Sequence, residues 1–441
     1  MDRIVYDLIN IGGGVTGTAS AFMATDYSNL SSVALIEKES EIAVLNSNHL
    51  MNSGTLHFGD IETNYGLEKA RSIKRAADLV ARYMTDRVTG DIFKRTHKMV
   101  LGVGTEEVVL LEKRHDEMKV LFPKLRKLNR EEIALYEPNV MKDRDPNEPV
   151  LALFNEYGFA VDYQALAKAF VEDAAKSGKR FDLFLGKKVV GLEKEADTYK
   201  VTLDDKTILY GKTVIVAAGG LSLVFAKKMG LGKEYGILPV AGNFYTAKNL
   251  IKGKVYRVQI KGIPFAAIHG DADVIDQNET RFGPTTQVLP LLERPHYSSF
   301  FDFLRASVFS LGSLFSLLKV LSNRTLLRFV IQNLIFGLAF FGKTSFTKKV
   351  KQIIPSITED QLTFGKGLGG IRPQVINTKT GKLEMGEVKI IGDNIIFDIT
   401  PSPGASICLK NAEGNIRKIV EMLGDGYCFD EEKFQKNFPL E

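Results

Sequence analysis

The chain has 441 residues, 44% of them hydrophobic and 25% charged, which is ordinary for a folded protein of two or three domain-sized cores. Its two cysteines, Cys408 and Cys428, exclude a disulfide framework and any metal site built from several cysteines. The formal net charge of +5 is too small to indicate nucleic-acid binding by itself.

The first thirty-odd residues carry the strongest pattern. Residues 5–11 predict an apolar strand, and a glycine turn at 12–17 leads into a helical stretch. A second strand at 32–36 ends at an acid, Glu37. This order of strand, turn, helix, strand and acid is typical of dinucleotide binding. Because the first strand begins almost at Met1, we expect no signal peptide.

Each glycine of the turn has a separate task in this pattern. Gly12 permits the tight turn, Gly14 lets the backbone approach a pyrophosphate, and Gly17 lets the helix pack closely on the strand. The N-terminus of the helix would point N–H groups at the phosphates, and Glu37 would accept the ribose hydroxyls. The other residues expected to contact the cofactor here are Val15, Thr16 and Lys38.

Further elements follow along the chain. Residues 187–193 and 199–203 predict a hairpin, and residues 213–218 predict a buried parallel strand that ends at Gly219. Near the C-terminus a strand at 395–399 leads into a Pro- and Gly-containing loop at 400–406 and then a helix to Met422. This second strand–loop–helix junction could offer backbone N–H groups to an electron-rich ligand edge.

The fold class is predicted to be α/β, with a Rossmann-like FAD-binding domain built from discontinuous segments and a β-sheet-rich substrate domain. We expect strands of the substrate domain at 254–259 and 265–269. Interleaved domains suit a flavin enzyme better than an NAD dehydrogenase, whose nucleotide domain is usually contiguous. The predicted FAD-binding segments are 1–90, 153–225 and 362–441, and the predicted substrate-domain segments are 91–152 and 226–361.

Several motifs together resemble the D-amino-acid-oxidase-like flavoproteins, and in particular malate:quinone oxidoreductases of the short bacterial form. They are the opening fingerprint, Asn52-Ser53-Gly54-Thr55-Leu56-His57-Phe58-Gly59 with the following Ile61-Glu62-Thr63-Asn64-Tyr65, Ala217-Ala218-Gly219-Gly220, Leu238-Pro239-Val240-Ala241-Gly242-Asn243-Phe244-Tyr245, Pro264-Phe265-Ala266-Ala267-Ile268-His269-Gly270-Asp271, Gly370-Ile371-Arg372-Pro373-Gln374 and Pro401-Ser402-Pro403-Gly404-Ala405.

The resemblance implies a non-covalently bound FAD, oxidation of L-malate to oxaloacetate in the tricarboxylic acid cycle, and transfer of the electrons to a membrane quinone. It also implies a peripheral enzyme on the cytoplasmic face of the bacterial inner membrane. The Asn-Ser-Gly-x-x-His-x-Gly form at 52–59 is also similar to L-2-hydroxyglutarate dehydrogenases. That activity therefore stays open, as does a flavin-binding membrane scaffold without turnover.

Oxidation of a 2-hydroxy acid needs a cationic clamp for carboxylate and a base for the hydroxyl proton. Arginine suits the clamp because its planar fork meets a carboxylate with two hydrogen bonds, and the candidates are Arg372 and Arg281. Tyr245 is a further candidate for a bond to substrate. Histidine suits the base at neutral pH, and the candidates are His269 and His57.

The remaining predicted cofactor contacts lie in loops. Ser53 and Thr55 would touch the flavin ring or the pyrophosphate, and Val189 would touch the adenine through its backbone. Donors near Gly404 would stabilise the reduced flavin at its pyrimidine end. The other expected contacts are Gly54, Ala218, Gly219, Arg372, Pro403, Ala405 and Ser406. No cluster has metal-ligand spacing, so no metal site is predicted.

Residues 297–351 form a basic, Phe-rich insert in which Asp302 is the only acid. Its apolar stretch from Leu326 to Gly342 is too short and too polar for a membrane span. We expect amphipathic helices that lie in the membrane interface, with Lys and Arg facing anionic lipid. An ordinary helical core is the alternative, and nucleic acid is an unlikely partner because the aromatics do not form a stacking platform.

Overall fold

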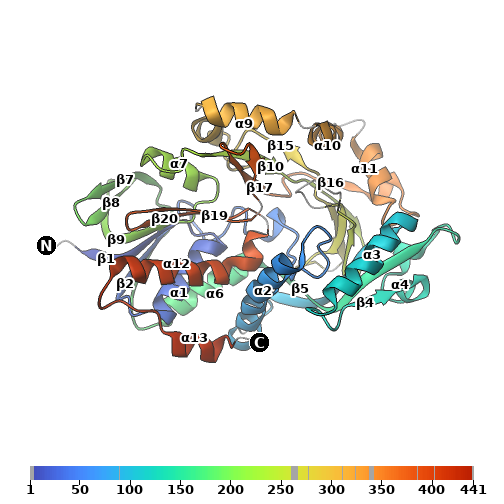
Figure 1. The fold of residues 1–441 in the computed structure, drawn as a ribbon, viewed down its shortest axis with the longest axis horizontal. Coiled ribbons are helices and arrows are strands. Elements are labelled where there is room, and N and C mark those ends of the chain that lie inside the picture. Colours follow the sequence, from blue (N-terminus) through green and yellow to red (C-terminus); the bar gives the residue numbers. More distant parts are fainter. Residues whose placement is uncertain are drawn as a thin grey trace.

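A computed structural model describes residues 4–88, 90–259, 267–276, 278–309, 311–322, 324–336, 342–384, 386–401 and 403–439. It consists of two eight-stranded sheets and one four-stranded sheet, with helices packed around them (Figure 1). This architecture confirms the predicted α/β class.

The first eight-stranded sheet carries the nucleotide pattern. Its strands run in the order β19-β20-β9-β1-β2-β6, and β8 extends it from β9 with β7 beyond. The central strand β1 pairs in parallel with both β2 and β9. The bounds are β1 (Val5–Ile11), β2 (Ser32–Ile36), β6 (Arg180–Phe184), β7 (Val189–Glu195), β8 (Thr198–Leu203), β9 (Ile208–Val216), β19 (Val388–Gly392) and β20 (Ile395–Ile399). The predicted strands 5–11, 32–36 and 395–399 have these same bounds.

This sheet is buried on both faces, which explains why its central strands are almost continuously apolar. On one face, Leu8 joins a core formed by four helices: α1 (Val15–Tyr27), α2 (Leu67–Arg87), α6 (Tyr163–Lys176) and α12 (Cys408–Leu423). On the other face, Ile9 joins a core that includes α7 (Leu221–Lys228).

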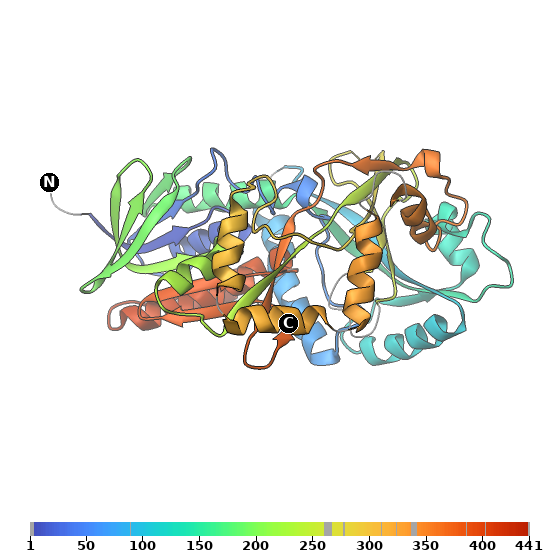
Figure 2. The ribbon, with the colours of Figure 1, turned by 90° about the horizontal axis from the view of Figure 1, so that it is seen from above.

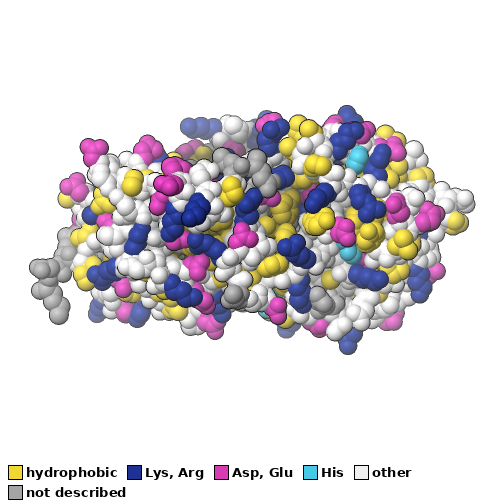
Figure 3. Space-filling model, turned by 90° about the horizontal axis from the view of Figure 1, so that it is seen from below, with side chains coloured by type: hydrophobic (Ala, Val, Ile, Leu, Met, Phe, Trp, Pro, Cys, Tyr) yellow, Lys and Arg dark blue, Asp and Glu magenta, His cyan; other side chains and the backbone are white. Residues whose placement is uncertain are grey.

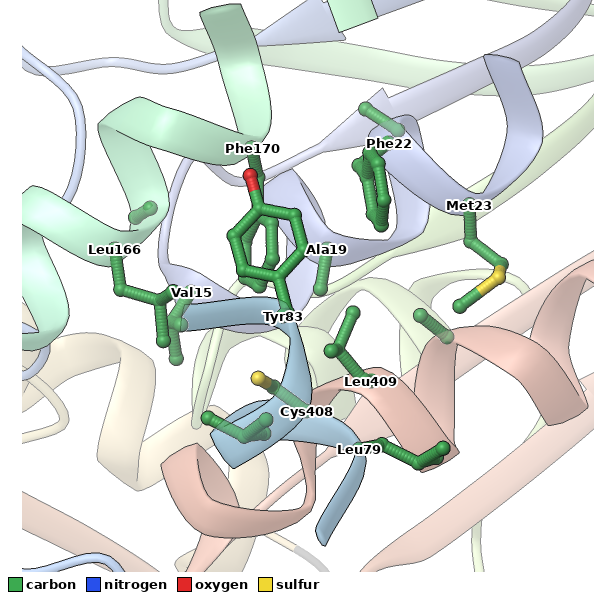
Figure 4. Packing of buried hydrophobic residues seen from close by; sticks show 14 of the residues in the cluster. Val15, Ala19, Phe22, Met23, Leu79, Tyr83, Leu166, Phe170, Cys408 and Leu409 are labelled. Atoms are coloured by element: carbon green, nitrogen blue, oxygen red, sulfur yellow. The ribbon is translucent and has the colours of Figure 1, made fainter. Parts of the chain in front are cut away.

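Helix α1 is enclosed on all sides, so its few polar residues need partners inside the fold. Every residue of α1 except Asp26 is buried. The hydroxyl of Thr18 donates to Gly14 O at 3.1 Å and that of Ser20 to Thr16 O at 3.0 Å, so both are satisfied by the helix itself. Phe22 stacks on Phe170 of α6, with ring centroids 5.4 Å apart (Figure 4). This packing holds the N-terminus of α1 at the glycine turn.

The other two sheets contain the strands of the segments predicted to bind substrate, together with three strands from the segment 362–441 that was predicted to bind FAD. The larger runs β16-β11-β14-β13-β12-β3-β5-β4, and the smaller runs β15-β10-β17-β18. The bounds are β3 (Phe93–Val103), β4 (Arg126–Leu128), β5 (Val150–Val161), β10 (Tyr235–Ala241), β11 (Phe244–Lys248), β12 (Lys254–Arg257), β13 (His269–Ala272), β14 (Glu279–Gly283), β15 (Gln287–Val288), β16 (Thr363–Gly365), β17 (Ile371–Asn377) and β18 (Lys382–Leu383).

The structure bears on two predictions about this region. The predicted strand 254–259 is present as β12, but the predicted strand 265–269 lies partly outside the described residues, and His269 begins β13 rather than ending a strand. The predicted segment border at 152/153 falls inside β5, which pairs with β3 from Val150 to Val161.

The remaining helices are α3 (Thr105–Met118), α4 (Arg130–Tyr136), α5 (Pro138–Met141), α13 (Glu431–Asn437) and the short η1 (His49–Met51), η3 (Glu359–Gln361) and η4 (Gly404–Ile407).

The basic insert is helical and lies along one face of the molecule, on the side turned to the viewer in Figure 2. Its elements are α8 (Ser299–Phe303), η2 (Leu304–Val308), α9 (Leu311–Leu321), α10 (Arg324–Ile335) and α11 (Gly342–Val350). Lys227 of α7 donates to Ala306 O at 2.6 Å, and Ser307 Oγ bonds both backbone groups of Ile237. These polar contacts attach the insert to the body of the fold.

Within the described ranges, no single helix is long and apolar enough to cross a membrane. One pair of helical segments, Ser299–Val308 and Gly312–Lys319, is long and apolar enough only when the two are taken together, and they are bent by 94° relative to each other.

Candidate active site

A cavity of about 560 Å³ lies where the three sheets meet. Its volume is in the range of small-molecule and cofactor sites. Of the residues predicted to bind cofactor, all but Gly17 line this cavity. They are Gly12, Gly14, Val15, Thr16, Glu37, Lys38, Ser53, Gly54, Thr55, Val189, Ala218, Gly219, Arg372, Pro403, Gly404, Ala405 and Ser406.

The glycine turn is shaped so that two of its positions admit no side chain. Gly12 has a φ of +113°, and a Cβ there would lie 2.5 Å from Ala217 O. A Cβ on Gly17 would lie 1.9 Å from Gly12 O, so Gly17 supports the turn from behind while the turn itself faces the cavity. Gly14 caps α1, and the N–H of Val15 in the first helical turn donates to Ser47 Oγ at 3.1 Å. The N-terminus of α1 therefore lies at the cavity, and a helix N-terminus favours a phosphate.

Glu37 lies beyond the end of β2, at the adenosine end of this pattern. Its carboxylate accepts from Gly13 N at 2.6 Å and from Glu39 N at 2.9 Å. Burial raises the pKa of Glu37, against the effect of these two bonds. The neighbouring Lys38 lines the cavity but pairs with Glu293, which connects β2 to the loop before α8.

Two adjacent antiparallel strands contribute a group of four polar side chains that lie next to one another. Tyr256 of β12 faces His269 of β13, and Lys254 faces Asp271. The rings of Tyr256 and His269 stack with centroids 4.5 Å apart. His269 Nδ1 lies 2.5 Å from Asp271 Oδ2, and Lys254 Nζ lies 3.4 Å from Asp271 Oδ1. This is an ion-pair contact, and His269 itself lines the cavity, where an imidazole beside a carboxylate can act as a general base.

The charges of this group depend on one another because all of them are buried. Burial would raise the pKa of Asp271, but His269 and Lys254 outweigh it and hold that pKa below its usual range. Burial lowers the pKa of Lys254, against the attraction of Asp271. Burial and the charge of Asp271 raise the pKa of Tyr256 well above its usual value, so its phenol stays neutral. The Tyr256 hydroxyl lies 2.6 Å from Thr55 Oγ1, and Lys254 donates to Ser53 O at 2.8 Å.

His57 forms a second histidine–carboxylate pair in the same cavity. Its Nδ1 lies 2.5 Å from Glu62 Oε1, and its ring centroid lies 6.3 Å from that of Tyr256. Burial would raise the pKa of Glu62, but His57 and a nearby lysine lower it. The His57 backbone N–H donates to Ser406 Oγ at 3.0 Å, which joins this pair to the loop before α12.

Arg372 of β17 is half-buried and differs from the buried arginines that the structure describes, all of which have hydrogen-bond partners. It lines the cavity, and its guanidinium has no hydrogen-bond or ion-pair partner within the described ranges. Burial lowers the pKa of Arg372, and Tyr256 is the group that opposes this. Because an uncompensated buried cation is costly, such a guanidinium is expected to have an anionic ligand as its partner.

Two residues predicted to bind substrate lie outside this cavity. Arg281 does not line the cavity, because it pairs with Asp273 and Glu279 and donates to His49 O at 2.7 Å. Tyr245 also lies outside the cavity. Its hydroxyl donates to Phe336 O at 2.9 Å, and its ring stacks on Phe346 with centroids 4.3 Å apart, so it is a packing residue.

Sequence reasoning missed Tyr256, Lys254, Asp271 and Glu62. For the first three, the alternation of side chains along a strand could have indicated the group. Lys254 and Tyr256 are two residues apart and share one face of a strand, as do His269 and Asp271. Glu62 had no such signal, since it reaches His57 through an irregular loop. No group of three or more metal-ligating side chains comes together in the part of the chain that the structure describes.

The residues present fit an FAD molecule. The turn at Gly12 and Gly17 would hold the phosphates and Glu37 would accept the ribose hydroxyls, and η4 lines the same cavity. With these contacts in place, FAD would extend from Glu37 and Val189 toward Ser53, Thr55 and Gly404.

Comparison with known proteins agrees with this geometry. The sequence profile of the malate:quinone oxidoreductase family matches residues 5–421. The chain is 38% identical to a probable malate:quinone oxidoreductase of Campylobacter jejuni, over 98% of this chain and 99% of that protein. It is 36% identical to a malate:quinone oxidoreductase of Helicobacter pylori, over 99% and 98%.

Among solved structures, FAD-bound L-α-glycerophosphate oxidase of Mycoplasma pneumoniae has a similar fold, with a TM-score of 0.65 and 18% identity over 98% of this chain and 97% of that one. This likeness shows a shared fold. That the protein is an FAD-dependent oxidoreductase, as the resemblance implied, follows from its family and its relatives. With a family profile over nearly its whole length and two relatives above 35% identity, the chain belongs to the malate:quinone oxidoreductase family.

Proposed function

We propose that this enzyme oxidises L-malate to oxaloacetate and passes the electrons to a membrane quinone. The observation that carries the proposal is the unpaired Arg372 guanidinium in the same cavity as the His269–Asp271 pair. When bound, FAD supplies the two-electron acceptor, which takes the C2 hydrogen of malate as a hydride at flavin N5.

Arg372 binds the C1 carboxylate of malate with two parallel hydrogen bonds and so fixes the position of C2. His269 accepts the hydroxyl proton at Nε2, because its Nδ1 is directed to Asp271. Asp271 orients the ring and stabilises the imidazolium that forms. The balance is complete: malate loses one proton to His269 and one hydride to the cofactor, and C2 becomes a carbonyl carbon.

Tyr256 and Lys254 support this arrangement. The Tyr256 ring packs against the imidazole, and Lys254 connects Asp271 to the Ser53 carbonyl. Both therefore link the proposed base to the 53–55 loop that faces the cofactor. His57 is the second candidate base. Its pairing with Glu62 and with Ser406 Oγ suits it better to hold the cofactor-facing loops together.

The direct test is anaerobic bleaching of the flavin absorbance of the purified holoenzyme. We expect rapid bleaching by L-malate and little by L-2-hydroxyglutarate, followed by recovery when a soluble quinone is added. Bleaching by hydroxyglutarate alone would move the assignment to the related dehydrogenase activity. If neither acid bleached the bound flavin, the substrate proposal would fail and a flavin-binding scaffold would be the better description.

His269→Gln and His57→Gln separate the two histidines in the same assay. We expect His269→Gln to slow bleaching about 10²- to 10⁴-fold, the usual contribution of a general base. His57→Gln should slow bleaching less than His269→Gln does, and it should lower the retention of flavin more. The opposite ranking would transfer the role of base to His57.

We also propose that the insert places the enzyme on the cytoplasmic face of the bacterial inner membrane, as a peripheral protein bound to anionic lipid. Aromatic side chains on it face outward: Phe301, Phe309 and Phe315 are 61%, 72% and 67% exposed. Arg305 and Lys319 lie on the same helices and are also exposed. Apolar side chains flanked by cations are the composition of an interfacial surface.

Vesicle flotation tests this membrane proposal. The wild type should float with vesicles that contain phosphatidylglycerol, and less with purely zwitterionic vesicles. Phe301→Ser with Phe315→Ser should reduce binding to both, whereas the matched change Phe364→Ser, at an exposed Phe outside the insert, should not. Unchanged flotation of the double variant would contradict the proposal.

A further inference from the structure

A second unpaired cation lines the same cavity as Arg372. Lys69 lies in the first turn of α2, is half-buried, and has no carboxylate partner in the described part of the chain. Its Nζ lies 4.3 Å from the centre of the Tyr65 ring. Burial lowers the pKa of Lys69, and no neighbouring negative charge opposes that shift.

The position of Lys69 is unfavourable for the helix that carries it. A cation in the first turn of a helix faces the positive end of the helix dipole. Lys74, one turn later on α2, has the usual arrangement, with Asp78 at 2.7 Å in an i,i+4 pair. Helix stability therefore does not account for Lys69, whereas an anionic ligand in the cavity would.

A rigid loop connects Lys69 to the reacting groups. The Tyr65 N–H donates to Glu62 O at 3.3 Å, and the Glu62 carboxylate holds His57. Arg114 donates to Glu62 O at 2.7 Å and also to Tyr65 O, which fixes both ends of this turn. Lys69 is thus held near the His57–Glu62 pair, and Lys69 and Arg372 line the same cavity from α2 and β17 respectively.

The proposed substrate is a dianion, and Arg372 meets only one of its carboxylates. Arg281, the predicted second clamp, is occupied by Asp273 and lies outside the cavity. We infer that Lys69 binds the distal carboxylate of the substrate and thereby selects dicarboxylic over monocarboxylic 2-hydroxy acids. This inference rests on the proposed function, because it assigns the second anionic group of that same substrate.

The test compares Lys69→Met with wild type, using L-malate and L-lactate, which lacks the distal carboxylate. The apparent dissociation constants come from anaerobic flavin bleaching. We expect malate binding to weaken about 10- to 100-fold in the variant, as for loss of a hydrogen bond to a charged group, and lactate binding to stay within about 2-fold. Lys74→Met is the matched control on the same helix, and Lys69→Arg should restore most of the preference.

A binding measurement makes the test independent of turnover. Succinate has both carboxylates but no hydroxyl, so its affinity for the holoenzyme can be measured by calorimetry. It should weaken in Lys69→Met and in a second variant, Lys69→Gln, but not in Lys74→Met. Unchanged malate and succinate affinities, or equal weakening of malate and lactate, would overturn the inference. If malate failed to bleach the wild type while succinate binding still depended on Lys69, the proposed function would fail and the dicarboxylate site would stand.

Discussion

Replacement of Arg372 by Met should have opposite effects on ligand binding and on the stability of the ligand-free protein. The guanidinium is half-buried and has no acidic partner in the described ranges, so its removal deletes an uncompensated charge. We expect the ligand-free variant to unfold at a higher temperature than the wild type. Malate binding should fall, because the carboxylate loses two charge-assisted hydrogen bonds.

The size of the binding loss follows from those two bonds. At about 1.5–3 kcal/mol for each hydrogen bond to a charged group, the loss is about 3–6 kcal/mol. Since about 1.4 kcal/mol corresponds to a tenfold change, the dissociation constant should rise about 10²- to 10⁴-fold. Spectral titration of the flavin with malate measures the affinity, and differential scanning fluorimetry measures the stability.

Arg281→Met provides the matched control. Arg281 pairs with the buried Asp273 and lies outside the cavity. Its loss should therefore destabilise the fold and leave malate affinity nearly unchanged, the reverse of the pattern at Arg372. Malate affinity within about threefold of wild type in Arg372→Met would refute the reasoning, and so would a clear loss of stability in the ligand-free variant.

The other predictions use separate features of the fold. Asp271→Asn should slow malate-dependent flavin bleaching by about 10²-fold, because the proposed base loses its orienting partner, and should change the malate dissociation constant less. Stopped-flow absorbance measures the bleaching rate and the dissociation constant separately. An unchanged bleaching rate would exclude the orienting role of Asp271. Gly17→Ala should release FAD, because a Cβ there would lie 1.9 Å from Gly12 O. The ratio of flavin to protein after gel filtration measures the loss of FAD. Full retention of FAD would show that the turn can accommodate the side chain. Asp7 should make the fold acid-sensitive. Burial alone would raise its pKa, but Lys212 and Ser31 hold it at about 2. A carboxylate with a depressed folded-state pKa stabilises the fold above its unfolded pKa of about 3.9 and loses that contribution as the pH falls toward 2. Asp7→Asn should therefore have a flatter acid-unfolding curve between about pH 4 and 2, and a curve parallel to that of the wild type would contradict this linkage.

The cofactor-binding half of the site was predictable because its signals are local. The glycine turn, the strands at 5–11 and 32–36 and the acid at Glu37 fall within one continuous stretch, and each follows from steric or periodic requirements of the backbone. The same holds for the strand at 395–399 and the loop after it.

Only the tertiary structure decided which charged residues face the substrate cavity. Arg281 and Arg372 looked alike in sequence, both in loops or strands near glycines. The pairing of β13 with β14 places Asp271 beside Arg281 in register, and the following turn supplies Asp273, which neutralises that arginine. Arg372 lies in β17 of a different sheet, where no carboxylate faces it within the described ranges.

The stacking of Tyr256 on His269 likewise comes from the register of β12 and β13, two short strands whose connection gives no local signal of that register. The sequence by itself therefore determined the fold class and the position of the glycine turn, because local backbone geometry encodes them, and its motifs indicated the cofactor through their resemblance to a family. Which cations and carboxylates line the cavity was settled by strand register and by the competition of nearby carboxylates for each cation. Those are long-range properties that no single stretch of the chain contains.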